Sequence, residues 1–195
     1  MVFAGLLLAS GIGHATTISG EIWQNVQTAA QSGLIASAPG TAADAEFSTN
    51  AINYDSRVTG YTPALFFNNP TFFNTSGTFD PNASLDNMYA LFTGKLWLNS
   101  GGNLFSIAHD DGFELSIPGA GYDLQEGGPH YPSITTDTIT AGSAGLYDFT
   151  LSYGEAWGPP AVLDMAAVPE PGTFTLFLAG AGLFALIAYR RRRTA

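Results

Sequence analysis

Adjacent aspartates near the middle of the chain offer the clearest chemistry in the sequence. Asp110 and Asp111 follow His109 and precede Gly112. Ca²⁺ takes about six to eight oxygen ligands, and two neighbouring carboxylates on a tight turn supply the charged part of such a site. Alternatively, the turn is structural, and the aspartate side chains accept hydrogen bonds from backbone N–H groups. The residues leave both interpretations open.

Further ligands for a cation at this turn would have to come from other loops. Glu155, Asp123 and Glu126 are candidate carboxylates, and Trp157 could stack on a sugar ring. His109 would lie within the turn, where a protonated imidazole would weaken cation binding. We therefore take Asp110 and Asp111 as the expected metal ligands. The expected ligand-binding neighbours are His109, Gly112, Glu155 and Trp157.

Other chemistries have weaker support. His109 and His130 lack a third metal ligand at a diagnostic spacing, so we expect His130 to be a solvated loop residue. The sequence contains no Gly-x-Ser-x-Gly motif and no cysteine. Glycoside hydrolysis needs two carboxyl groups about 5 to 9.5 Å apart across a cleft, and adjacent aspartates are poorly placed for that. We expect a protein that binds a ligand, with no catalytic residue.

The elements that must position these residues follow an apolar pattern of period two, which is typical of β-strands. Strands are expected at residues 18–23, 95–98, 104–109, 113–117, 146–153 and 161–165. One or two helical turns are expected within residues 24–36. Several short strands predict an all-β fold, a two-sheet antiparallel β-sandwich. The Asp-Asp turn would join two strands, with Gly112 available for a positive φ.

Aromatic residues are concentrated between Tyr54 and Phe79. We expect them to pack irregular segments against the sandwich, because aromatic side chains bury large apolar areas. An exposed platform that stacks on sugars is the alternative.

The order of the central strands resembles a known domain family. Phe92-Thr93-Gly94, then Asp110-Asp111-Gly112, then Ala144-Gly145-Leu146-Tyr147 leading to Tyr153-Gly154-Glu155, is similar to the lectin-like β-sandwich domain named after anthrax protective antigen. The resemblance covers about residues 89–165. It implies that Asp110 and Asp111 are joined by a cis peptide bond and bind Ca²⁺, which in turn holds sugar hydroxyls.

Two positions depart from that family pattern. Ile117-Pro118-Gly119 stands where many members have Ile-Asp-Gly, which removes one carboxylate. Asp164 and Met165 stand where the family's last apolar stretch often ends in tryptophan.

The C-terminus has three parts in a fixed order. Val168-Pro169-Glu170-Pro171 is followed by the uncharged residues 173–189 and then by Arg190, Arg191, Arg192 and Arg193. A helix of this length spans roughly 26 Å, close to a membrane span, and the arginines act as a cytoplasmic stop. This tail resembles the PEP-CTERM sorting signal. The resemblance implies recognition of the Pro-Glu-Pro motif by exosortase and anchoring by a transmembrane helix until the tail is processed.

The N-terminus and the charge agree with export. Residues 3–13 resemble the apolar region of a signal peptide, with a signal peptidase site after Ala15. Since no basic residue precedes Arg57, we expect the true start to lie upstream. Residues 1–15 are thus the expected signal peptide, 16–167 the ectodomain and 168–195 the sorting tail. Residues 16–168 carry 15 acidic and 2 basic side chains, a formal charge of −13. Such a surface repels nucleic acid and attracts cations.

The sequence therefore predicts an exported protein, anchored in the inner membrane by its C-terminal helix and then delivered to the cell surface or extracellular matrix. The leading hypothesis is carbohydrate binding, with a polysaccharide or glycan held through Ca²⁺. A structural or protein-binding component of the biofilm or envelope matrix is the alternative. A glycoside hydrolase accessory is the third.

Overall fold

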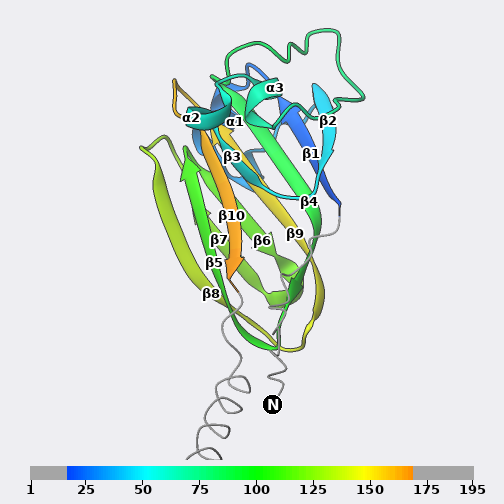
Figure 1. The fold of residues 1–195 in the computed structure, drawn as a ribbon, viewed down its shortest axis with the longest axis vertical. Coiled ribbons are helices and arrows are strands. Elements are labelled where there is room, and N and C mark those ends of the chain that lie inside the picture. The colour runs from blue at the N-terminus through cyan, green and yellow to red at the C-terminus, as the bar shows by residue number, and fades with distance from the viewer. Residues whose placement is uncertain (1–16, 169–195) are drawn as a thin grey trace, which may run out of the picture.

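Residues 17–168 are described by the computed structural model, and they form two antiparallel β-sheets packed face to face (Figure 1). One sheet has the strand order β2-β1-β4-β9-β6-β7, and the other has the order β3-β10-β5-β8. The strands are β1 (Ile18–Trp23), β2 (Ala45–Thr49), β3 (Asn53–Asp55), β4 (Met88–Leu98), β5 (Gly101–Asp110), β6 (Phe113–Ile117), β7 (Tyr122–Glu126), β8 (Ser133–Ala141), β9 (Gly145–Glu155) and β10 (Val162–Val168). The predicted all-β sandwich is confirmed.

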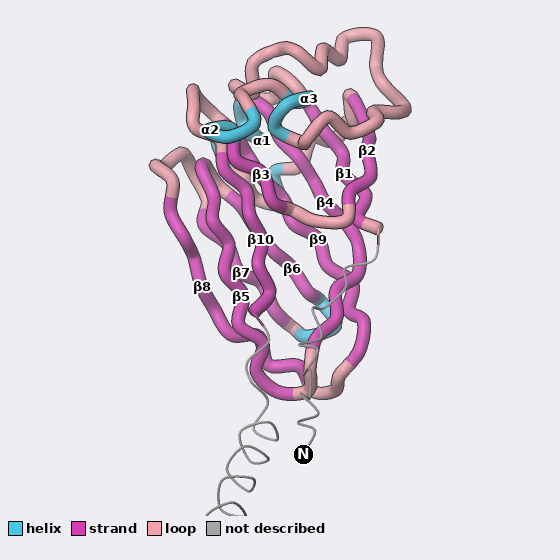
Figure 2. The backbone as a smooth tube through the Cα atoms, in the orientation of Figure 1, coloured by secondary structure: helices cyan, strands magenta, loops and turns pink. Residues whose placement is uncertain are grey.

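Short helices complete the fold. They are α1 (Gln27–Ser32), α2 (Ser56–Thr59), α3 (Pro63–Phe66) and the 3₁₀ turns η1 (Ile35–Ser37) and η2 (Pro118–Ala120). The predicted helical turns within residues 24–36 correspond to α1 and η1. Figure 2 shows α1, α2 and α3 together with the longest loop at one end of the sandwich.

The predicted strands show the expected alternation of buried apolar side chains with more exposed residues. In β6, Phe113, Leu115 and Ile117 are buried while the two residues between them are partly exposed. Four strands, β2, β3, β7 and β8, had no prediction. The longest of these, β8, is an edge strand rich in threonine that buries only Ile139 and Ala141 fully, so its apolar period is faint.

The aromatic segment packs into the core, as expected. Tyr54, Phe66 and Phe67 are buried, and Phe67 meets Phe47 of β2 with ring centroids 4.9 Å apart. Phe66 stacks against Tyr153 of β9 at 6.0 Å. The exception is Phe73, which is 41% exposed. Each such ring pair adds about 0.5–1.5 kcal/mol beyond area burial, and together they hold α3 onto the sandwich.

The Asp-Asp turn passes from one sheet to the other. β5 pairs with β8 and β10, whereas β6 pairs with β7 and β9. The turn is therefore a corner of the sandwich, at the end where α1, α2 and α3 lie (Figure 1).

The last strand leads away from this corner. In the β5–β10 register, Val162 lies opposite Asp110, and Val168 lies opposite Leu104. Asp110 and Val168 are thus at opposite ends of the same sheet. Within residues 17–168, no helix is long and apolar enough to cross a membrane. The predicted signal peptide, the Pro-Glu-Pro motif, the helix at 173–189 and the arginine cluster lie outside the described residues.

Candidate functional site

The two aspartates are buried at the corner of the sandwich. Asp110 ends β5 and is 6% exposed, while Asp111 is 5% exposed. A cis peptide bond joins them, as the resemblance implied. Burial of two neighbouring carboxylates is costly unless hydrogen bonds or a positive charge compensate it.

Hydrogen bonds fix the Asp111 side chain. Its Oδ1 accepts a hydrogen bond from the His130 backbone N–H at 2.9 Å, and its Oδ2 accepts one from the Ala156 N–H at 2.8 Å. The carboxylate thus ties two loops to the corner, residues 127–132 and residues 156–161. Each oxygen keeps a second lone pair. Backbone capping, the structural alternative, is therefore present at Asp111 and is compatible with a cation on the same carboxylate.

Asp110 has a different environment. Burial raises its pKa to about 7, and the negative charge of Asp111 acts in the same direction. Electrostatic interactions with His130 and with the Arg57 guanidinium oppose this rise in pKa only partly. A proton or a cation is therefore favoured at this carboxylate near neutral pH.

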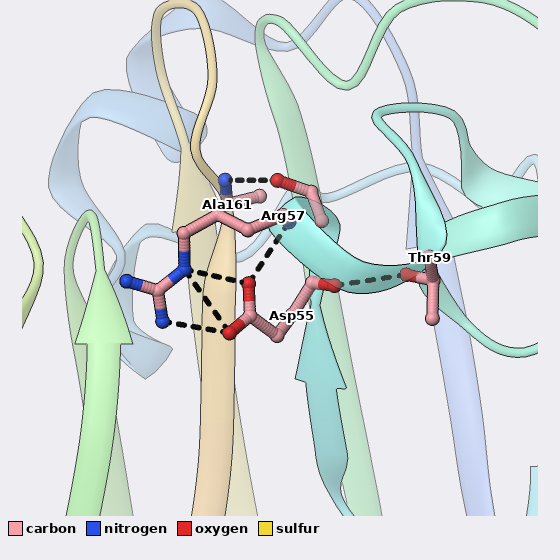
Figure 3. Close-up of polar contacts among 5 residues, drawn as sticks. Asp55, Arg57, Thr59 and Ala161 are labelled. Carbon is pink, nitrogen blue, oxygen red and sulfur yellow. Dashed lines mark hydrogen bonds and ion pairs between the residues drawn. The ribbon is translucent and has the colours of Figure 1, made fainter.

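The two basic side chains of residues 17–168 form ion pairs elsewhere. Arg57 contacts Asp55 at 2.6 Å, and Lys95 contacts Asp148 at 2.5 Å. In Figure 3 the Arg57 guanidinium is held by both Asp55 carboxylate oxygens, and the Arg57 N–H is capped by the same side chain. Arg57 therefore acts on Asp110 through its charge, while its hydrogen bonds go to Asp55.

The helix that carries Arg57 is also tied to the 156–161 loop. The Ser56 hydroxyl oxygen accepts a hydrogen bond from the Ala161 N–H at 2.8 Å (Figure 3). Ser56 N–H donates in turn to the Ala161 carbonyl at 2.9 Å. These two hydrogen bonds fix α2 beside the start of β10.

Glu155 is buried below the corner. It is 1% exposed, and its two oxygens contact the hydroxyls of Tyr61 and Tyr153 at 2.8 Å each. Tyr61 also contacts Asp86, and Tyr153 also contacts the Asp110 carbonyl oxygen. These four contacts can be filled by only two hydrogens when Glu155 is ionised, but by three when it is protonated.

Burial raises the pKa of Glu155 to about 9, in agreement with this count of hydrogens. A protonated Glu155 can donate to the Tyr153 hydroxyl oxygen, which leaves the Tyr153 hydrogen for the Asp110 carbonyl oxygen. Glu155 therefore positions the backbone of the aspartate pair, and its own side chain has almost no access to solvent.

The remaining predicted residues separate into near and distant ones. Trp157 is 62% exposed on the 156–161 loop, next to Ala156. Asp123 is exposed and pairs with Ser116, three residues along β7 from Glu126. Asp123 therefore lies away from the corner.

The expected positive φ of Gly112 is wrong, because Gly112 is absent from the positive-φ glycines of the described chain. A Cβ at Gly112 would come within 2.8 Å of the Ser32 carbonyl oxygen and 3.0 Å of the Gly128 nitrogen. The missing side chain allows α1 and the 127–132 loop to approach the turn.

Asn87 was not anticipated. Its side-chain Oδ1 is buried without a hydrogen-bond partner among the described residues. Its backbone N–H donates to the Ala156 carbonyl at 3.2 Å, while the N–H of the same Ala156 binds Asp111. An unpaired amide oxygen is a signal that only a folded structure can give.

The two histidines form a group that the sequence spacing concealed. The rings of His109 and His130 lie 4.6 Å apart at 86°, and one ligand atom each of His109, His130 and Glu126 lie within 4.8 Å of one another. The expectations of no third ligand and of a solvated His130 are therefore wrong. His130 is half-buried, and its Nε2 has no hydrogen-bond partner among residues 17–168. Burial lowers the pKa of His109, which favours a neutral imidazole at pH 7.

Comparisons with known proteins give a sorting motif and a fold. Residues 167–193 match the PEP-CTERM protein-sorting motif. The motif therefore overlaps the last two residues of β10. It marks an exported, exosortase-sorted surface protein with a C-terminal membrane anchor before sorting. A search of curated proteins gives no match.

Two solved structures share the fold at low sequence identity. The PA14 domain of the antifreeze protein MpAFP is similar with a TM-score of 0.59 and 16% identity, over 81% of this chain and 86% of that one. The PA14 sugar-binding domain of an RTX adhesin has a TM-score of 0.56 and 16% identity, over 80% of this chain and 90% of that one. The chain therefore has a PA14-type β-sandwich followed at its C-terminal end by a PEP-CTERM motif.

Proposed function

We propose that this sorted surface protein binds carbohydrate through a Ca²⁺ ion held by Asp110 and Asp111. The observation that carries the proposal is the pair of buried, adjacent carboxylates, with which neither basic side chain of residues 17–168 forms an ion pair. A hard divalent cation compensates two such charges and prefers oxygen ligands.

The surroundings contribute further oxygen ligands. Asp111 is oriented by two backbone N–H groups and keeps lone pairs for an ion. Asn87 Oδ1 is a neutral oxygen that lacks a hydrogen-bond partner among the described residues. The backbone N–H of Asn87 donates a hydrogen bond to the Ala156 carbonyl oxygen. Ca²⁺ accepts mixed carboxylate, amide and carbonyl ligands in flexible geometry. Sugar hydroxyls would complete the coordination sphere.

The position of the corner suits a ligand from outside the cell. Asp110 lies at the opposite end of its sheet from Ala167 and Val168, where the sorting motif begins. Trp157 is exposed close by and offers an aromatic face to a sugar ring. The RTX adhesin domain that shares this fold is described as sugar-binding, which supports the proposal without identifying a sugar.

A glycan array tests the proposal. The full chain, in a detergent without a sugar headgroup, is applied in Ca²⁺ and then in chelator. We expect binding to one class of glycan that chelation abolishes and that Asp110→Asn weakens at least tenfold. Asp123→Asn removes an exposed carboxylate of β7 and should bind like the wild type. Binding that is equal in Ca²⁺ and chelator, or absent in both, would refute the calcium-dependent mechanism.

A further inference from the structure

We propose that His109, Glu126 and His130 form a second cation site, specific for Zn²⁺ or a similar transition-metal ion. Their ligand atoms lie within 4.8 Å of one another, on β5, β7 and the loop after β7. Two imidazoles and one carboxylate are a ligand set that zinc commonly takes, with a fourth position left for water. This site differs from the adjacent proposed calcium site in its ligand chemistry, because Ca²⁺ favours oxygen ligands alone.

Hydrogen bonding sets the tautomer of His109. Its Nδ1 lies 2.9 Å from the Asp111 carbonyl oxygen, which can only accept, so Nδ1 carries the hydrogen. In the neutral ring, Nε2 therefore presents a lone pair to Glu126, whose Oε2 is 3.4 Å away. An outer hydrogen bond to a backbone carbonyl is the usual way to orient a metal-binding histidine.

The same arrangement is repeated at His130. Its Nδ1 lies 2.9 Å from the Tyr131 carbonyl oxygen, so its lone pair is also on Nε2. That atom is buried, and no hydrogen-bond partner exists for it among the described residues. A buried acceptor without a donor is costly in a folded protein. A metal ion in contact with Nε2 would remove this cost.

Glu126 completes the set at the protein surface. Its Oε2 accepts the single hydrogen of the Thr135 hydroxyl at 2.6 Å. Thr135 also lies 2.9 Å from His109 Nε2, but it cannot donate to both. Ser133, at 3.2 Å, is then the hydroxyl that can donate to that nitrogen when metal is absent.

The spacing of one ligand pair in the group fits zinc. Tetrahedral zinc with bonds of about 2.0–2.1 Å places its ligand atoms about 3.3 Å apart. The His109 Nε2 to Glu126 Oε2 distance of 3.4 Å already has this value. The Glu126 side chain is 44% exposed, which leaves access for the ion and for a water ligand.

Zinc at this position would link the 127–132 loop to β5 and β7. His130 belongs to the loop 127–132, and its backbone N–H binds Asp111 Oδ1. Joining His130 to His109 and Glu126 would hold that loop against the Asp-Asp corner. The site therefore stabilises the loop that orients Asp111, whatever ligand the aspartates take.

Titration of the full, tag-free chain with ZnCl₂ in detergent and excess Ca²⁺ tests the assignment. Isothermal calorimetry should show one strong Zn²⁺ per chain. His130→Phe keeps a planar ring without nitrogen, and Glu126→Gln removes the charge at a partly exposed side chain. Each should weaken Zn²⁺ binding at least tenfold, since even the loss of an outer-shell partner costs about 10–100-fold. Circular dichroism confirms that the variants remain folded.

Two controls make the result decisive. Asp123→Asn should keep the Zn²⁺ affinity of the wild type, and Zn²⁺ should slow hydrogen exchange at the His130 amide. Loss of Zn²⁺ binding in Asp110→Asn, with retention in His130→Phe, would place the ion at the aspartates and refute the proposal. Absence of strong binding in the wild type would refute it as well.

Discussion

Replacement of Asp110 by asparagine should stabilise the metal-free protein. Asp110 is 6% exposed, and burial beside Asp111 raises its pKa to about 7 from an ordinary value of 3.8. At pH 8 the carboxyl is ionised in both the folded and the unfolded state. The folded protein therefore bears the whole cost of the shift, about 4 kcal/mol at 1.36 kcal/mol per pKa unit.

The sign of the pH dependence follows from the same shift. Below pH 3.8 the carboxyl is protonated in both states, and the cost is absent. Between pH 3.8 and about 7 only the unfolded chain releases the proton, so the free energy of unfolding falls as the pH rises. Asparagine has the shape of the acid without its charge. Allowing for local relaxation, we expect Asp110→Asn to gain about 2–4 kcal/mol at pH 8 and almost nothing at pH 4.

Thermal unfolding of the full chain in detergent and chelator measures this gain. For a chain of this size each kcal/mol raises Tm by about 2–4 °C, so 3 kcal/mol corresponds to roughly 6–12 °C. Added Ca²⁺ should reverse the order of the two proteins. At about 1,000 times Kd the ion stabilises the wild type by about 4.1 kcal/mol, which exceeds the variant's gain of about 3 kcal/mol, and the variant should gain little from the ion.

Asp123→Asn is the matched control, because it removes one exposed carboxylate and leaves the corner intact. A lower Tm for Asp110→Asn at pH 8 in chelator would show that the Asp110 carboxylate is stabilised in the apoprotein. The same gain at pH 4 as at pH 8 would show that charge is not its cause. Either result would remove the physical basis of the calcium site.

Further predictions concern the support of the corner and the core. Glu155→Gln should flatten the pH dependence of stability in urea unfolding, because the wild type loses stability from pH 4.5 up to the folded pKa of about 9. An equal slope of the free energy of unfolding against pH in both proteins would contradict a protonated Glu155. Gly112→Ala should cost about 1–3 kcal/mol, since its Cβ would lie 2.8 Å from the Ser32 carbonyl oxygen, whereas Gly142→Ala, with open space around it, should be close to neutral in the same unfolding assay. Phe66→Ala should lower the free energy of unfolding by about 3–5 kcal/mol in denaturant, and Phe73→Ala by less than about 1 kcal/mol, because Phe66 is buried and Phe73 is 41% exposed. Similar losses in the two variants would refute the assigned packing.

Local patterns in the sequence were enough for the class of the fold and for the sorting motif. The period of two placed β6 and β9, because each inward side chain of a half-buried strand has to be apolar regardless of its partner strand. Recognition of the tail needs only the order of residues 167–193. The Asp-Asp turn was likewise visible, since both aspartates and Gly112 are neighbours in the chain.

The environment of the corner could not be read in this way, because it depends on contacts between residues distant in sequence. Glu155 resembled an accessible ligand, yet Tyr61 and Tyr153 enclose it. The edge strand β8 has too few buried residues to show a period. Gly112 looked like a turn glycine, but its Cα approaches α1, which lies some eighty residues earlier in the chain.

The difference is clearest at the two proposed cation sites. Adjacent carboxylates can be recognised from the sequence, because one peptide bond holds them close together in any fold. His109, Glu126 and His130 come together only when β5 of one sheet and β7 of the other are joined at the corner of the sandwich. Burial then gives each site its own protonation and hydrogen-bonding state. A pKa of about 7 at Asp110 and an unpaired Nε2 at His130 arise from the exclusion of water, which no spacing of residues encodes.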